Sequence, residues 1–232
     1  MKRFTAPILV AALAGSLALS GCQELFTTSL AEPLARDEVP VPDSLSKDQA
    51  AEYAALVAAN RDTELAQALM PAMAELVADN PGDAGVLGDA VTTAGIATGL
   101  EDAFMDAIDA IDIDTLIDDP DSVDPATFAG LLAGVSVDAD AAAVFAALAT
   151  ADAAELDEAG VNAANYVVAA VALVIADVES QAGDLENLLD TDFSGYTAGP
   201  EATLAIDIIN AAAAQWPDDD LISAMQSLFD IL

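Results

Sequence analysis

The sequence predicts an all-α protein, either an Ala-rich multi-helix bundle or a helical-repeat-like array. Three observations indicate this class. Alanine, the best helix former, dominates the segments that follow residue 45. No alternation of β-branched and polar residues of strand length occurs. Turn signals rich in Asp, Asn, Gly and Pro separate the Ala-rich segments at 80–83, 118–125, 198–200 and 216–220.

The first 21 residues have the composition of a secretory signal peptide. Lys2 and Arg3 give a positive start, and residues 6–19 are apolar or small. This apolar run is shorter than the roughly 20 residues that span a bilayer. We therefore expect residues 1–21 to be a cleaved targeting segment and not a part of the folded domain.

The only cysteine of the chain, Cys22, follows Leu19, Ser20 and Gly21. This stretch resembles the lipobox of bacterial lipoprotein precursors. The resemblance implies cleavage between Gly21 and Cys22, a diacylglycerol on the Cys22 sulfur and a further acyl chain, such as palmitate, on the new amino terminus. Because Gln23 and not Asp follows the cysteine, it also implies the cell outer membrane, with the protein facing the periplasm or the cell surface. Lipid would use the one thiol, leaving none for a disulfide or a nucleophile.

The remainder divides into a tether and a body. Residues 22–45 contain three prolines, which predicts an extended tether behind the lipidated cysteine. Residues 46–232 are expected to form one acidic all-helical domain. Related segments at 56–60 and 76–80 hint at duplication, and the Asn-Pro-Gly-Asp at 80–83 resembles the inter-helix turn of tetratricopeptide repeats. The fuller repeat signature is missing, so both bundle and repeat array stay open.

Three segments of the body have distinct helical patterns. Residues 166–176 are apolar on all sides, which predicts a central, buried helix too short for a membrane. Residues 101–112 separate apolar side chains from aspartates, as an amphipathic helix does. In 218–232, three aspartates precede an apolar stripe, where the helix dipole favours negative charge. That stripe consists of Leu221, Met225, Leu228 and Leu232.

Charge excludes some classes of function. The chain has 41 acidic and five basic residues, and no Lys, Arg or His follows Arg61. Such a body repels phosphate backbones, so nucleic-acid binding is excluded. With 55% hydrophobic residues the chain still has enough apolar side chains for a core. The acids indicate either a solvated shell suited to a salty habitat or a face that binds cations or a basic partner.

Residue types also limit the chemistry. Without His, the Ser-His-Asp and Cys-His arrangements and the common zinc sites are excluded. No phosphate-binding loop with its Lys occurs. Carboxylate pairs alone would be enough for glycoside hydrolysis, but paired spacing is expected by chance among so many acids. We therefore predict no catalytic residue, and keep a carboxylate-only envelope hydrolase as an alternative.

One loop has a more specific pattern. In residues 190–201, Asp190, Asp192 and Ser194 occupy positions one, three and five, Gly195 position six and Glu201 position twelve. This resembles an EF-hand calcium loop, in which oxygen ligands alternate, Gly makes the sharp turn and a bidentate Glu completes the shell. Phe193 and Thr197 depart from the pattern, and an ordinary acidic loop between helices explains the same residues. We assign no metal or other cofactor here, and keep a calcium-binding lipoprotein as an alternative.

Together these observations predict a lipid-anchored protein of the cell envelope that is a non-enzymatic binding or scaffold module. Its expected contacts are the membrane, through the lipid on Cys22, and an envelope protein partner.

Overall fold

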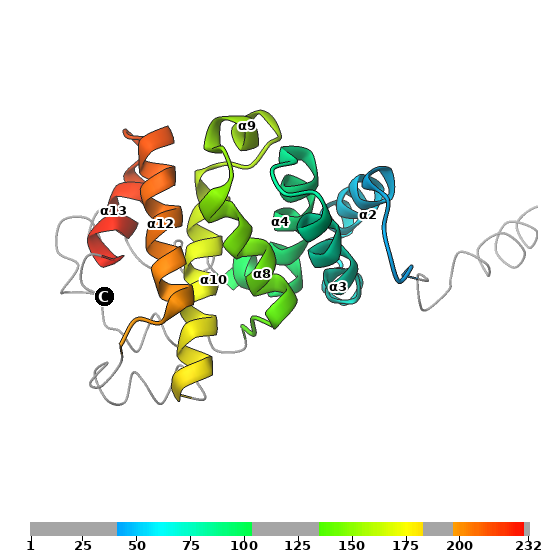
Figure 1. Ribbon diagram of the computed structural model, residues 1–232, viewed down its shortest axis with the longest axis horizontal. Coiled ribbons are helices and arrows are strands. Elements are labelled where there is room, and N and C mark those ends of the chain that lie inside the picture. The colour runs from blue at the N-terminus through cyan, green and yellow to red at the C-terminus, as the bar shows by residue number, and fades with distance from the viewer. Residues whose placement is uncertain (1–40, 104–134, 183–196, 230–232) are drawn as a thin grey trace, which may run out of the picture. The chain divides into compact units, whose positions relative to one another are not determined.

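The computed structural model describes residues 41–103, 135–182 and 197–229. The chain divides into two units, residues 1–40 and residues 41–232, and all described residues belong to the second. Within them the structure has nine helical elements and no strand (Figure 1). The predicted all-α class is therefore confirmed, in the form of a multi-helix bundle.

The first three described helices pack on one another. They are α2 (Lys47–Asn60), α3 (Thr63–Asp79) and α4 (Ala84–Ala97), and α4 contacts both of the others. The turn predicted at 80–83 separates α3 from α4. Gly82 adopts a positive φ of 85°, which glycine reaches without steric cost. The local sequence thus sets the antiparallel return of α4 along α3.

The later helices form a second group around α10. They are α8 (Ala139–Ala147), the 3-10 turn η2 (Leu148–Thr150), α9 (Ala153–Glu158), α10 (Ala163–Ala182), α12 (Pro200–Gln215) and α13 (Asp220–Phe229). α10 packs along α12, and α12 packs against α13 (Figure 1). α8 contacts α3 and α4 as well as α10. One continuous apolar core therefore runs through both groups.

Aspartates begin most of these helices. In five cases an Asp side chain accepts a hydrogen bond of 2.8–3.3 Å from a backbone N–H of the first helical turn. Such caps satisfy N–H groups that have no partner within the helix and are worth about 1 kcal/mol each. Part of the acidic composition therefore specifies where helices start. The capping residues are Asp62, Asp83, Asp138, Asp152 and Asp219.

The predicted central helix is present and buried, but it is longer than predicted. α10 runs from Ala163 to Ala182, well beyond residues 166–176 on its C-terminal side. By length and composition alone, Ala163–Gln181 is apolar enough to cross a membrane. The argument from short length was therefore wrong. The evidence for a core helix is instead its burial, because residues 166–173 are all buried within the bundle.

The C-terminal helix follows the predicted pattern in part. Asp219 caps α13 and Asp220 is its first residue, as the dipole argument predicts. Met225 is buried, but Leu221 is only half-buried, and Ile222 is buried beside Met225. The side chains of Leu228 and Leu232 lie outside the described residues, as do residues 104–112 of the other predicted amphipathic helix.

Candidate functional site

Most of the predicted site residues lie outside the described residues. This holds for Gly21 and Cys22 of the predicted cleavage and lipidation site, and for Asp190, Asp192 and Ser194 of the calcium loop. Glu201 alone is described, half-buried in the first turn of α12. Within the part of the chain that the structure describes, no group of three or more His, Cys, Asp or Glu side chains is placed to hold a metal ion. Calcium binding therefore stays a prediction.

A buried carboxylate joins α10 to the start of α12. Asp177 is fully buried on α10, and its Oδ2 accepts a 3.1 Å hydrogen bond from the N–H of Gly199 and a 2.8 Å bond from Gln181 Nε2. Gln181 Nε2 also donates to the carbonyl of Thr197 at 3.0 Å. Charged acceptors make the stronger hydrogen bonds in proteins. This junction joins α10 to the residues that precede α12.

Gly199 is required at this junction by close approach. Its φ of −86° is open to any residue, so the backbone conformation does not demand glycine. A Cβ atom built there, however, would lie 2.1 Å from Asp177 Oδ1 and 3.0 Å from Gln181 Nε2. The helix start can reach the buried carboxylate because no side chain stands between them. The junction is therefore a packing contact between α10 and the start of α12.

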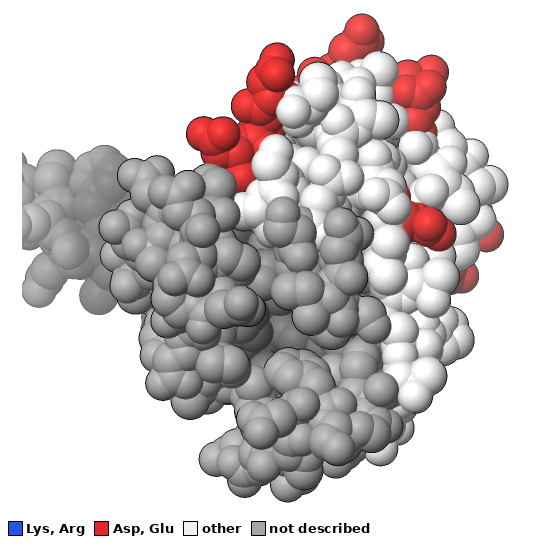
Figure 2. Space-filling model, turned by 90° about the vertical axis from the view of Figure 1, so that its left-hand side faces the viewer, with Lys and Arg blue, Asp and Glu red and all other residues white. Residues whose placement is uncertain are grey.

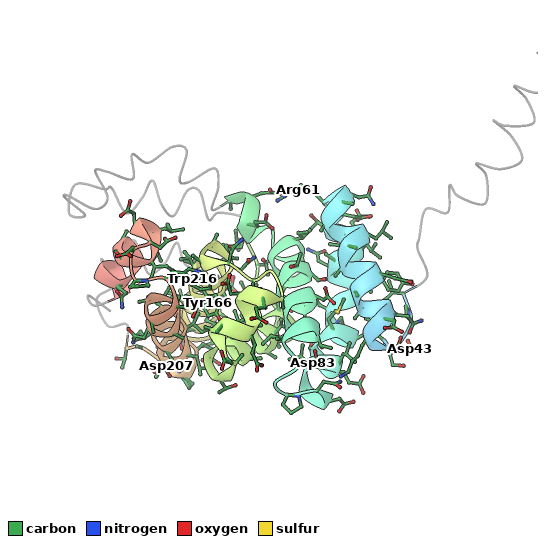
Figure 3. The ribbon with its side chains drawn as sticks, turned by 90° about the horizontal axis from the view of Figure 1, so that it is seen from above. Asp43, Arg61, Asp83, Tyr166, Asp207 and Trp216 are labelled. Atoms are coloured by element: carbon green, nitrogen blue, oxygen red, sulfur yellow. The ribbon has the colours of Figure 1, made fainter. Side chains whose placement is uncertain are left out.

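An aromatic pair lies where the ends of α10 and α12 meet. The rings of Tyr166 and Trp216 are 5.3 Å apart and inclined at 70°, an edge-to-face arrangement (Figure 3). The buried Tyr166 hydroxyl has no hydrogen-bond partner among the described residues. Burial, with smaller contributions from Asp152 and Asp157, raises the pKa of Tyr166 to about 12. A neutral, inaccessible phenol of this kind is a poor general base at neutral pH.

Both basic residues of the described part form ion pairs between helices. Lys47 Nζ lies 2.6 Å from Asp83 Oδ2, and Arg61 pairs with Glu101 at 3.5 Å and with Asp102. The hydrogen bond from Lys47 lowers the pKa of Asp83. The Coulombic attraction of Glu101 raises the pKa of Arg61. These pairs are solvent-exposed, so each contributes at most about 1 kcal/mol to stability.

Most of the described surface on the face drawn in Figure 2 is uncharged. Figure 2 shows Asp and Glu side chains gathered along one edge of this face, with no Lys or Arg among its described atoms.

Two partly buried carboxyl groups have raised pKa values. The pKa of Asp89 is raised by burial and by the nearby Asp83, and that of Glu179 by burial. Each of these two groups is penalised for being charged in the fold.

The local patterns of the sequence did not identify the Asp177 junction or the aromatic pair. A usable signal for the first was present, since Asp177 interrupts an apolar run and buried acids are found only with partners. No such signal marks Tyr166 and Trp216, which come together only through the packing of α10 and α12. Comparison with protein-family models, curated proteins and solved structures gave no match.

Proposed function

We propose that this chain is a lipid-anchored protein of the bacterial cell envelope that acts as a non-enzymatic binding or scaffold module. One observation carries the proposal: Leu19-Ser20-Gly21-Cys22 follows a positive start and a short apolar run. In this proposal Cys22 becomes the first residue of the mature protein and carries the lipid. The helical body is held at the membrane by a tether.

The thermodynamics of anchoring support a lipid on Cys22. Each buried CH₂ group contributes about 0.8 kcal/mol, so one acyl chain binds only reversibly, whereas two or three together give a durable anchor. The body itself repels anionic surfaces, because its acids far outnumber its basic residues. A covalent lipid supplies the attraction that such a body lacks.

The test is to express the full chain in a bacterium and compare Cys22→Ser with Ser20→Ala. The expected wild-type product begins at Cys22 and carries a diacylglycerol mass in the intact-protein spectrum. Ser20→Ala keeps a small residue before the cleavage site and is the matched control, so it should mature like the wild type. Cys22→Ser should accumulate as an unprocessed precursor without lipid. Maturation of Cys22→Ser at the same bond, with retention in the membrane fraction, would contradict the proposal.

The two alternatives make different predictions. For calcium, calorimetric titration should show one saturable site that Glu201→Gln removes, whereas diffuse uptake that Glu201→Gln leaves unchanged indicates counterions around a polyanion. For a hydrolase, the purified protein should release soluble fragments from an envelope glycan. Cross-linking in intact envelopes, followed by purification of the lipidated chain, identifies the partner that the scaffold hypothesis requires.

A further inference from the structure

Acidic residues gather around the end of the bundle at which α9 lies. Figure 1 shows α9 at the upper end, and Figure 2, turned about the vertical axis, shows acidic side chains along the same upper edge. We call this set the acidic pole; it comes from α9 with its capping residue and from the start of α13 with the turn before it, and its members are Asp152, Glu155, Asp157, Glu158, Asp218, Asp219 and Asp220. All of them are exposed except Asp219, which is half-buried. The two described basic residues pair with acids elsewhere, so no described cation neutralises the acidic pole.

The aromatic pair connects the two halves of the acidic pole. The rings of Tyr166 and Trp216 are 5.3 Å apart, and Asp218 follows Trp216 closely in the chain. The charged groups that act on the Tyr166 phenol are Asp152 and Asp157, which both raise its pKa. Coulombic forces weaken with distance, so the hydroxyl end of the ring lies toward these two carboxylates. The phenol is therefore directed into the acidic pole.

The hydroxyl of Tyr166 lacks what buried polar groups normally have. The residue is fully buried, and its hydroxyl has no hydrogen-bond partner among the described residues. Nearly all buried polar atoms in native proteins have such a partner. A ligand that supplies one therefore binds more tightly here than at an ordinary acidic surface.

The packing of α9 gives a ligand access to this hydroxyl. α9 has six residues, and Leu156 is the one among them that is buried. Segments with few buried contacts open locally at the lowest cost. A small displacement of α9 is therefore the movement that exposes the phenol.

We propose that the acidic pole binds a basic segment of a partner polypeptide, with Trp216 and the acids contacting its Lys or Arg side chains and the Tyr166 hydroxyl donating to one of its carbonyl groups. This inference rests on the proposed function as a binding module, and it names the chemistry of the partner.

The residue types of the acidic pole favour a polypeptide over a bare cation. Carboxylates make strong charge-assisted hydrogen bonds with Lys and Arg, and the half-buried Trp216 offers the ring type that attracts cations best. A phenol donates to a peptide carbonyl, whereas a metal ion has no acceptor for its O–H. Among the described residues, moreover, no three acidic side chains are placed to hold a metal ion.

The experiment uses the intrinsic fluorescence of Trp216, the single tryptophan of the chain, which reports directly from the acidic pole. The full chain, purified in detergent, is titrated at physiological salt with a short capped peptide of alternating Arg and Gly. The variants are Tyr166→Phe and Asp157→Asn. Asp207→Asn is the matched control, because Asp207 is exposed on α12, outside the acidic pole (Figure 3), and its substitution changes the net charge by the same amount.

We expect a saturable change in Trp216 emission for the wild type. Tyr166→Phe should raise the Kd about fivefold, the effect of one lost hydrogen bond. Asp157→Asn should raise it about threefold, the effect of one exposed ion pair, and Asp207→Asn should leave it unchanged.

Several results would overturn the proposal. They are an absent or unsaturable emission change, equal weakening by Asp157→Asn and Asp207→Asn, and an unchanged Kd in folded Tyr166→Phe. The same emission change with magnesium chloride alone would assign the acidic pole to simple cations and overturn it as well. If circular dichroism shows that Tyr166→Phe does not fold, the comparison of the two Asn variants decides. The titration does not depend on the lipid, so a chain without lipid on Cys22 would contradict the anchor and leave this result standing.

Discussion

The contact between Gly199 and Asp177 allows a sharp test of the fold, because one added methyl group has nowhere to go. The Cβ of Gly199→Ala would lie 2.1 Å from Asp177 Oδ1, far inside van der Waals contact. Asp177 is fully buried and already accepts hydrogen bonds from Gly199 and Gln181, so it cannot move without losing them. Either α12 shifts away from α10 or the carboxylate loses a donor.

The magnitude follows from these two responses. Forcing an extra carbon into a packed site costs about 1–3 kcal/mol, and a lost hydrogen bond to a charged group about 1.5–3 kcal/mol. Because either response relieves the other, we expect a cost of about 1.5–3 kcal/mol. For a domain of this size that lowers the Tm by roughly 3–12 °C.

Thermal unfolding followed by circular dichroism measures the change in Tm of Gly199→Ala, with Gly95→Ala as the matched control. Gly95 lies inside α4, where the nearest atom to an added Cβ, among those outside its own helix backbone, is Glu101 Oε2 at 3.8 Å. That substitution should stabilise the protein by about 0.5–1 kcal/mol, because alanine loses less backbone entropy in a helix. The two Gly→Ala changes thus have opposite predicted signs. A Tm of Gly199→Ala equal to or above that of the wild type would refute the steric argument. So would a cost that is undiminished when Asp177→Ala removes the opposing carboxylate.

Three further predictions concern ionisation and charge. Tyr166 has a folded pKa of about 12, above the usual value of about 10, so its contribution to stability is complete below pH 10 and is lost as the pH rises toward 12. Tyr166→Phe should therefore remove this loss of stability in melting experiments at high pH. The same substitution should cost little at pH 7, because the hydroxyl has no hydrogen-bond partner among the described residues. Burial raises the pKa of Asp89, so the folded state disfavours its charge, and Asp89→Asn should raise the Tm at pH 7 with a gain that vanishes as the pH falls below about 4. The excess of 41 acidic over five basic residues predicts a Tm that rises steeply with salt toward 1 M, and a flat Tm would show that the acids are too dispersed to repel one another.

Local chemistry explains which parts of the fold the sequence made predictable. The helical class follows from alanine content, and the turn at 80–83 follows from glycine and from an aspartate that caps the next helix. The length of α10 was underestimated because Asp177 and Glu179 end the apolar run, which normally marks a helix end. The helix nevertheless continues through them, and the Asp177 carboxylate accepts a hydrogen bond from Gly199, which lies 22 positions away in the sequence. Contacts at that separation leave no periodic signal in a sequence.

The same distinction applies to the site. The lipobox-like stretch and the calcium-loop pattern are contiguous in sequence, so they were predictable as hypotheses. The edge-to-face pair of Tyr166 and Trp216, and the choice of which side of α2 is buried, depend on which helices pack together. The pattern of α2 is weak, because its apolar residues are mostly alanine and occur on both its buried and its exposed sides. Only its neighbours in the fold decide which side is covered.

The capping aspartates separate two roles that acidity has in this protein. Asp138 accepts a 2.8 Å hydrogen bond from the N–H of Ala141 at the start of α8, and it also adds to the net negative charge. Asparagine caps helices about as well as aspartate but has no charge, whereas alanine neither caps a helix nor carries a charge. We therefore expect Asp138→Ala to cost about 1 kcal/mol at low and at high salt. Asp138→Asn should be neutral or stabilising at low salt, with no gain at 1 M salt, where repulsion is screened. If Asp138→Asn instead costs as much as Asp138→Ala, the charge at the helix N-terminus, and not the cap hydrogen bond, is what the fold requires of this residue.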